Sequence, residues 1–266
     1  MASVERSGRS TRGSPGHASH PAPGTTPRDE PIQVSGGPTP GMELEAGVHA
    51  LPVDVAFGDR EMTLNPVAVE TPRGLLLLDV GMPDGADDLA DALEADGLDL
   101  ADAWAVVITH QDVDHAGCLA EVVDRTGAVV FAHEADAPFV EGEVELEKST
   151  AERPMSYPPV SVDVRLVGGE TFATDAGPMR AVYTPGHTPG HTSYYLPDER
   201  LLVTADAMNV VDGRLVGPRE GATPDVATAW KSVERFADLD VEHTLCFHGG
   251  YVEAGNERIE ALLADR

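Results

Sequence analysis

The stretch Thr109-His110-Gln111-Asp112-Val113-Asp114-His115-Ala116-Gly117 constrains this chain more than any other. It follows an apolar run over residues 103–108, whose β-branched and aliphatic side chains predict a short buried strand. Residues that can bind ligands therefore lie where a strand ends and a loop begins, as functional residues commonly do. The alternative is an ordinary polar turn, but two imidazoles and two carboxylates so close together favour a metal site.

Length and composition indicate a soluble globular protein. The chain has 266 residues, 41% hydrophobic and 24% charged, which is enough for a large domain with a buried core. No apolar run approaches the roughly 18–20 residues of a membrane-spanning helix, and no apolar signal segment is visible at the N-terminus. Cys118 and Cys246 form no CxxC pair. We therefore expect a cytoplasmic protein with no membrane partner.

The charge of the chain is far from neutral. Its net charge is −28, and only Lys148 and Lys231 are lysines among the 18 basic residues. Carboxylates bind water and cations and keep a protein dispersed in concentrated salt, so we expect a salt-adapted, halophilic protein. The alternative is a merely acidic protein. An acidic surface also argues against a nucleic-acid partner, because binding to phosphates requires a surface patch of Lys and Arg.

Salt adaptation has a measurable consequence. We expect the midpoint of thermal unfolding to rise between dilute buffer and multimolar KCl, because salt screens the repulsion among carboxylates. Circular dichroism at increasing KCl concentrations measures this midpoint. If the midpoint stays unchanged, the merely acidic protein is the better interpretation.

The chain divides into two kinds of sequence. Residues 1–40 are rich in Ser, Gly, Pro, Thr and Arg, which predicts a disordered N-terminal tail. Strand-like and helix-like patterns alternate over residues 41–266, which predicts one α/β domain. In its first half, strands are predicted over residues 48–57, 62–70, 75–80, 103–108 and 128–132, and helices over residues 86–96 and 116–126.

The second half of this domain begins with an acidic, weakly patterned segment. Residues 134–160 predict a helix fragment and a long loop, which we interpret as a substrate lid. Thr223 is the predicted N-cap of a helix over residues 224–237. A last helix is predicted over residues 256–264, and strands over residues 162–167, 180–183, 193–196, 201–205 and 241–247.

Three further stretches place metal-binding residue types at predicted strand ends. Residues 184–191 read TPGHTPGH, and the Pro-Gly steps force tight turns that fix a histidine. Asp206 follows the strand over residues 201–205, and His248 follows the strand over residues 241–247. Together with residues 110–115, these would form a cluster of histidines and carboxylates, which suits borderline divalent metal ions.

The order of these motifs resembles the metallo-β-lactamase-fold hydrolases, whose fingerprint is HxHxDH, then a distant His, an Asp and a final His. The resemblance covers about residues 45–255, and TPGHTPGH looks like the version found in lactonase-like and glyoxalase II-like members. It implies an α/β fold, namely a four-layer αβ/βα sandwich of two mixed sheets flanked by helices. The residues that match the fingerprint are His110, Asp114, His115, His187, Asp206 and His248.

The resemblance also implies a role for each of these residues. The first of two divalent metal ions would be bound by His110, Asp112 and His187, the second by Asp114, His115 and His248, with Asp206 bridging. Asp79 would orient a ligand without binding metal, and His191 would have the same role, with metal binding by His191 as the less favoured alternative. Asp112 departs from the fingerprint, which has a histidine there. A carboxylate shifts the preference from zinc toward iron or manganese, or weakens that site so that one metal binds well.

By the same resemblance, the chain is a hydrolase of a small ester, lactone or thioester. A metal-bound hydroxide would attack the carbonyl group, and Asp114 would handle the proton of the leaving group. Two alternatives are a mononuclear iron sulfur-dioxygenase of the same fold and a non-catalytic binding descendant. β-Lactam hydrolysis is disfavoured, because Asp206 stands where the zinc β-lactamases have a cysteine. The substrate and the oligomeric state, a homodimer included, are left open.

Overall fold

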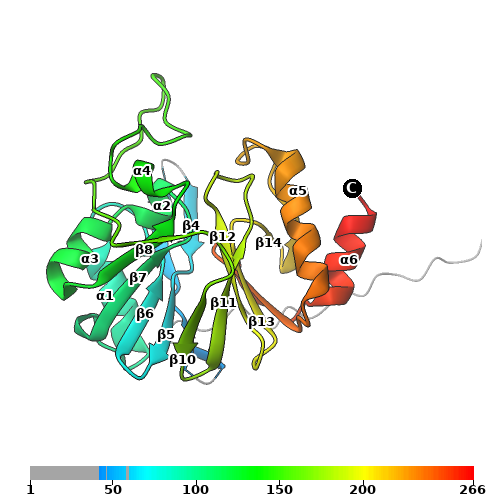
Figure 1. Cartoon of the computed structure of the whole chain (residues 1–266), viewed down its shortest axis with the longest axis horizontal. Coiled ribbons are helices and arrows are strands. Elements are labelled where there is room, and N and C mark those ends of the chain that lie inside the picture. The colour runs from blue at the N-terminus through cyan, green and yellow to red at the C-terminus, as the bar shows by residue number, and fades with distance from the viewer. Residues whose placement is uncertain (1–41, 46, 58–59) are drawn as a thin grey trace, which may run out of the picture. The chain divides into compact units, whose positions relative to one another are not determined.

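Two mixed β-sheets organise the part of the chain that the structure describes (Figure 1). The computed structural model describes residues 42–266 except residues 46 and 58–59, so the predicted tail over residues 1–40 lies outside the described residues.

The first sheet has seven strands, in the order β1 (Met42–Glu45), β2 (Val48–Ala50), β5 (Val67–Thr71), β6 (Gly74–Leu78), β7 (Ala103–Ile108), β8 (Val129–His133) and β9 (Val164–Leu166). The second has six, in the order β10 (Thr171–Thr174), β11 (Gly177–Tyr183), β12 (Thr192–Leu196), β13 (Leu201–Ala205), β16 (His243–Cys246) and β17 (Gly250–Val252). Two separate hairpins pair β3 (Val53–Phe57) with β4 (Arg60–Leu64), and β14 (Asn209–Val211) with β15 (Arg214–Val216).

Helices cover the outer face of each sheet (Figure 1). The first sheet is covered by α1 (Ala86–Ala95) and α3 (Leu119–Thr126), and the second by α5 (Val226–Glu234) and α6 (Asn256–Ala264). Short helical segments are η1 (Leu100–Asp102), α2 (Val113–Ala116), α4 (Ala137–Val140) and η2 (Arg235–Asp238). Over the described residues, no helix has the length and apolar character needed to cross a membrane.

Three buried apolar clusters separate the four layers. One lies between the first sheet and its helices, one between the two sheets, and one between the second sheet and its helices. In β6, Leu75 and Leu77 belong to the first cluster, whereas Leu76 and Leu78 belong to the second, because successive side chains of a strand point to opposite faces. A strand buried on both faces reads as a continuous apolar run. The predicted four-layer αβ/βα sandwich is confirmed.

Prolines divide two of the predicted strands. The predicted strand over residues 48–57 is two strands, β2 and β3, on either side of Pro52, and the one over residues 62–70 is β4 and β5, with Pro66 between them. Proline has no N–H for the strand ladder and restricts the residue before it. β2 and β5 therefore stay in the first sheet, while β3 and β4 form their own hairpin. The prediction of two long strands is wrong.

The helix starts also differ from the predictions. The N-cap of α5 is Asp225, whose Oδ1 accepts a hydrogen bond from the N–H of Thr228 at 2.9 Å. The prediction of Thr223 as the cap is wrong, and its Oγ1 lies instead 3.3 Å from Nδ1 of His187. The predicted helix over residues 116–126 begins at Leu119, with the short α2 before it.

Candidate metal centre

The residues of the site follow the carboxyl ends of strands. β6, β7, β8 and β9 run parallel in the first sheet, as do β13 and β16 in the second. Asp79 comes directly after β6, and His110 follows β7. Asp206 comes directly after β13, and His248 follows β16. Because parallel strands end at the same edge of a sheet, these side chains can meet there.

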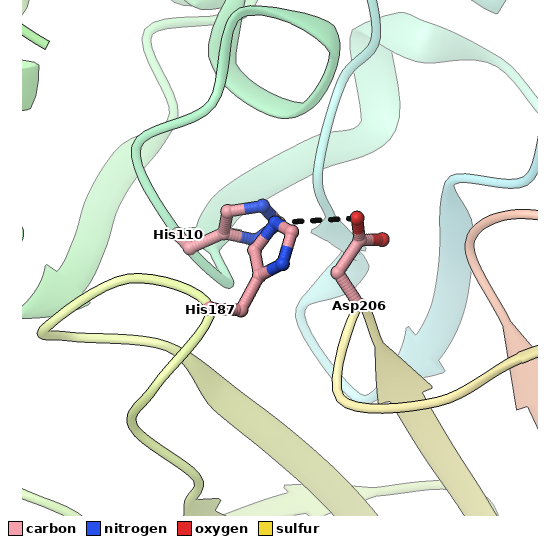
Figure 2. Close-up of side chains that lie close together, drawn as sticks. All are labelled: His110, His187 and Asp206. Carbon is pink, nitrogen blue, oxygen red and sulfur yellow. Dashed lines mark ion pairs between the residues drawn. The ribbon is translucent and has the colours of Figure 1, made fainter. Parts of the chain in front are cut away.

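The structure brings all seven predicted metal ligands together. His110, His187 and Asp206 form one group (Figure 2), and Asp114, His115 and His248 form a second; in each group the ligand atoms lie within 4.8 Å of one another. Asp206 contacts both groups. Its Oδ2 lies 3.3 Å from Nε2 of His187 and 3.4 Å from Nε2 of His248. Its Oδ1 lies 3.4 Å from Nε2 of His115, so this carboxylate stands between the two groups.

Asp112 faces the first group. Its Oδ2 lies 3.0 Å from Nε2 of His187 and 3.4 Å from Nε2 of His110. Burial raises the pKa of Asp112, but His110 and His187 outweigh burial and hold that pKa well below its usual value. Asp112 stands where the fingerprint has a histidine, and its carboxylate therefore faces Nε2 of both His110 and His187.

Hydrogen bonds turn Nε2 of two histidines toward the centre. Asp79 Oδ2 accepts a hydrogen bond from Nδ1 of His115 at 2.7 Å. Nδ1 of His110 lies 3.0 Å from the hydroxyl oxygen of Thr109, and that hydroxyl donates to Asp79 Oδ2 at 2.7 Å. An imidazole that donates from Nδ1 keeps a lone pair on Nε2. Both rings are therefore set to bind a cation through Nε2.

Three buried polar atoms at this centre support a metal ion. Among the described residues, Nε2 of His110, Nε2 of His115 and Oδ1 of Asp206 have no hydrogen-bond partner. Buried acceptors without a partner are costly, and a shared cation would satisfy all three. Imidazole and carboxylate together suit borderline divalent ions. The residues present therefore fit one or more such ions.

Electrostatics in the second group also favour positive charge. Burial lowers the pKa of His248, but Asp206 and Asp114 outweigh it and raise that pKa to about 9. Burial lowers the pKa of His115 as well, and the carboxylates of Asp79, Asp206 and Asp114 raise it well above its usual value. Protons and metal ions compete for the same imidazole nitrogens, so a site that holds protons this firmly attracts cations in general.

Asp79 and His191 form hydrogen bonds with predicted metal-binding residues, Asp79 with His115 and His191 with Asp206. Asp79 also accepts a hydrogen bond from the N–H of Thr109 at 2.8 Å and is 2% exposed. Nε2 of His191 accepts a hydrogen bond from the N–H of Asp206 at 3.0 Å, and its Nδ1 lies 2.8 Å from the hydroxyl oxygen of Thr184. Both nitrogens of His191 are thus engaged, which supports an orienting role for this residue.

Sequence reasoning missed Asp136 at this site. Its buried carboxylate accepts hydrogen bonds from the N–H groups of Gln111 and Gly190 at 3.0 and 2.6 Å, and from the hydroxyl of Thr188 at 2.7 Å. It therefore ties the loop that carries His110 to the loop that carries His187. No signal in the sequence identifies it.

Sequence reasoning also missed Lys148, which reaches the centre from the segment predicted as a lid. Its Nζ lies 2.5 Å from Oδ2 of Asp112. The one available signal was its rarity, since Lys148 is one of only two lysines in the chain.

A pocket of about 990 Å³ opens onto the centre. The predicted ligand residues Asp112, Asp114, His187, Asp206 and His248 lie in its wall. The rest of the wall includes three methionines and the basic residues Lys148, Arg153 and Arg219. Such a pocket has room for a small metabolite beside the site.

Comparisons with known proteins agree with this geometry. The family model described as the metallo-beta-lactamase superfamily matches residues 63–248. The chain is 29% identical over 238 residues to the probable metallo-hydrolase YflN of Bacillus subtilis (strain 168), covering 79% of this chain and 86% of that protein. It is 29% identical over 167 residues to a hydroxyacylglutathione hydrolase of Rhizobium meliloti (strain 1021), covering 62% of this chain and about half (54%) of that protein. The crystal structure of a metallo-beta-lactamase family protein from Thermus thermophilus matches with a TM-score of 0.66 and 25% identity, covering 84% of this chain and 80% of that one. The chain therefore belongs to the metallo-beta-lactamase superfamily.

Proposed function

We propose that the protein is a dinuclear metal-dependent hydrolase of small ester, lactone or thioester metabolites. The observation that carries the proposal is the position of Asp206, whose two carboxylate oxygens face ligand atoms of both groups. When bound there, divalent ions would lower the pKa of water toward about 7 and polarise a carbonyl group. Zinc is the expected ion, with iron or manganese as alternatives because Asp112 supplies a carboxylate.

Asp114 is the residue that we assign to proton transfer. Its side chain is 23% exposed, and its Oδ2 lies 3.3 Å from Nε2 of His248. It lines the pocket, where a substrate can reach it. A carboxylate in this position accepts a proton from water and returns it to the leaving group.

The pocket favours a substrate with a negative charge. Three basic side chains line it, although the whole chain has only 18 basic residues against 46 acidic ones. Asp112, Asp114, Asp206 and Glu220 also line the pocket. Bound metal ions would offset the charge of the three aspartates, and the basic side chains would then attract an anion into the site. The similarity to hydroxyacylglutathione hydrolases makes a thioester of a small hydroxy acid the first substrate to test.

Metal removal tests this function. We expect hydrolysis of a panel of acyl thioesters, lactones and esters to fall to the uncatalysed background after treatment with a chelator, and to return with zinc, iron or manganese. Release of thiol or acid measures hydrolysis, and elemental analysis after reconstitution with excess metal is expected to find about two metal equivalents per chain. One iron per chain with oxygen uptake would instead indicate the sulfur-dioxygenase alternative. A chain that binds no metal after reconstitution would contradict the proposal.

We further infer that the protein acts in a reducing, salt-rich cytoplasm. The acidic composition supports this inference, and Cys118 and Cys246 are buried free thiols. Burial raises the pKa of each thiol to about 12, which keeps it neutral and unreactive.

A further inference from the structure

Lys148 reaches two of the residues that the first metal ion would use. Its ammonium lies 2.5 Å from Oδ2 of Asp112 and 2.6 Å from Nε2 of His187. The lysine side chain is 19% exposed, so it is inserted into the site and does not extend into solvent. The other lysine of the chain, Lys231, is exposed on α5.

Hydrogen-bond chemistry makes Lys148 and a metal ion alternatives at His187. A lysine ammonium has only donors, so its contact with His187 uses the lone pair of Nε2. Nε2 and Oδ2 of Asp112 lie 3.0 Å apart, and the ammonium then donates to both of these acceptors. Nδ1 of the same ring faces the hydroxyl of Thr223 at 3.3 Å and can keep the ring proton. A metal ion about 2.0–2.1 Å from Nε2 would use the same lone pair. The two cations cannot occupy that lone pair together.

The segment predicted as a lid, residues 134–160, positions Lys148 through hydrogen bonds to Gln111, which lies between His110 and Asp112. The N–H of Glu147 donates to Oε1 of Gln111 at 2.8 Å, and the hydroxyl of Tyr157 donates to the carbonyl oxygen of Gln111 at 2.9 Å. Leu146, which precedes Glu147, is buried. Asp112 then gives the ammonium a carboxylate partner that the usual histidine could not give, so the departure from the fingerprint and the inserted lysine complement each other.

We propose that Lys148 competes with the first metal ion for Asp112 and His187, so that this site binds metal more weakly than the second and fills only when Lys148 withdraws. The inference rests on the proposed dinuclear function. It makes Lys148 the residue that determines how many metal ions the site holds at a given metal concentration.

A matched pair of variants tests the competition. Chelator-stripped wild type, Lys148→Met and Lys231→Met are titrated with Zn²⁺ against a chromophoric chelator. We expect two unequal binding steps in the wild type and a tightening of the weaker step by about 10- to 100-fold in Lys148→Met. The stronger step is expected to stay unchanged, and Lys231→Met is expected to behave like the wild type.

A second measurement uses the wild type and avoids any folding defect of the variants. An amine-acetylating reagent is applied at increasing Zn²⁺, and mass spectrometry compares the modification rates of Lys148 and Lys231. We expect the Lys148 rate, relative to Lys231, to rise several-fold as the weaker step fills, because Lys148 is displaced from the site.

The outcomes separate this inference from the proposed function. Equal binding steps that Lys148→Met leaves unchanged would overturn the competition while leaving a dinuclear hydrolase intact. Loss of a metal equivalent in Lys148→Met would also overturn it, since the lysine would then assist metal binding. A wild type that binds no zinc, iron or manganese would contradict the proposed function and the competition together.

Discussion

Replacing Asp79 by alanine is expected to lower the free energy of unfolding by about 3–5 kcal/mol. Its carboxylate accepts the N–H and the hydroxyl of Thr109 at 2.8 and 2.7 Å, and Nδ1–H of His115 at 2.7 Å. Alanine would leave these three donors buried without an acceptor. It would also adopt the φ of 61° at this position less readily than aspartate does. Denaturant titration in excess chelator measures the loss without any contribution from metal.

The same substitution is expected to weaken the second metal site. Without Asp79, the ring of His115 is no longer held with Nε2 toward the centre, and we expect an affinity loss of about 10- to 100-fold. Competition with a chromophoric chelator measures this affinity. Asp79→Asn keeps one oxygen acceptor and is expected to show a smaller loss of stability. Asp91→Ala, at an exposed position of α1, is the control and is expected to change stability by less than about 0.5 kcal/mol. Unchanged metal affinity in Asp79→Ala would contradict the orienting role.

The sequence predicts the parts of this fold that depend on local patterns. The strands over residues 103–108 and 201–205 are confirmed as β7 and β13, because strands buried on both faces show uninterrupted apolar runs. The candidate ligands were also accessible from sequence. His110, Asp206 and His248 follow such runs, and parallel strands bring their carboxyl ends to one edge. His187 follows the antiparallel, partly buried β11, and it was found from the TPGHTPGH motif instead.

Other features depend on contacts between distant segments. The β14–β15 hairpin was missed because its two strands of three residues each are too short to show a period. Thr223 has the side chain of a helix cap, yet it faces His187, and only the tertiary arrangement decides between these partners. Lys148 lies in a loop without periodicity, so nothing local indicates that it reaches Asp112.

Asp136 shows why a residue of this kind escapes sequence analysis. It lies in the acidic segment predicted as a loop, where an aspartate reads as a solvated side chain, yet it is 1% exposed. Its partners come from the motif around His110 and from the TPGHTPGH turn. Burial raises its pKa, while the hydrogen bonds from Thr188, Gly190 and Gln111 oppose that rise. The carboxylate therefore belongs to the scaffold that sets the spacing between the two ligand-bearing loops.

Asp136→Ala is accordingly expected to lower the free energy of unfolding by about 3 kcal/mol, because the buried N–H groups of Gln111 and Gly190 would lose their acceptor. Denaturant titration of the chelator-treated protein measures this loss, with Glu134→Ala at an exposed neighbouring position as the control. Gly190→Ala tests the contact between Gly190 and Asp136 by changing the loop that carries His187.

A Cβ at residue 190 would lie 2.6 Å from the backbone nitrogen of Asp136, so the two loops must separate, at a cost of about 1–3 kcal/mol. If the two loops are held together at this contact, both variants will also weaken metal binding at His110 and His187, whereas Glu134→Ala will not. Wild-type metal affinity in Asp136→Ala would show that the loops keep their spacing without it.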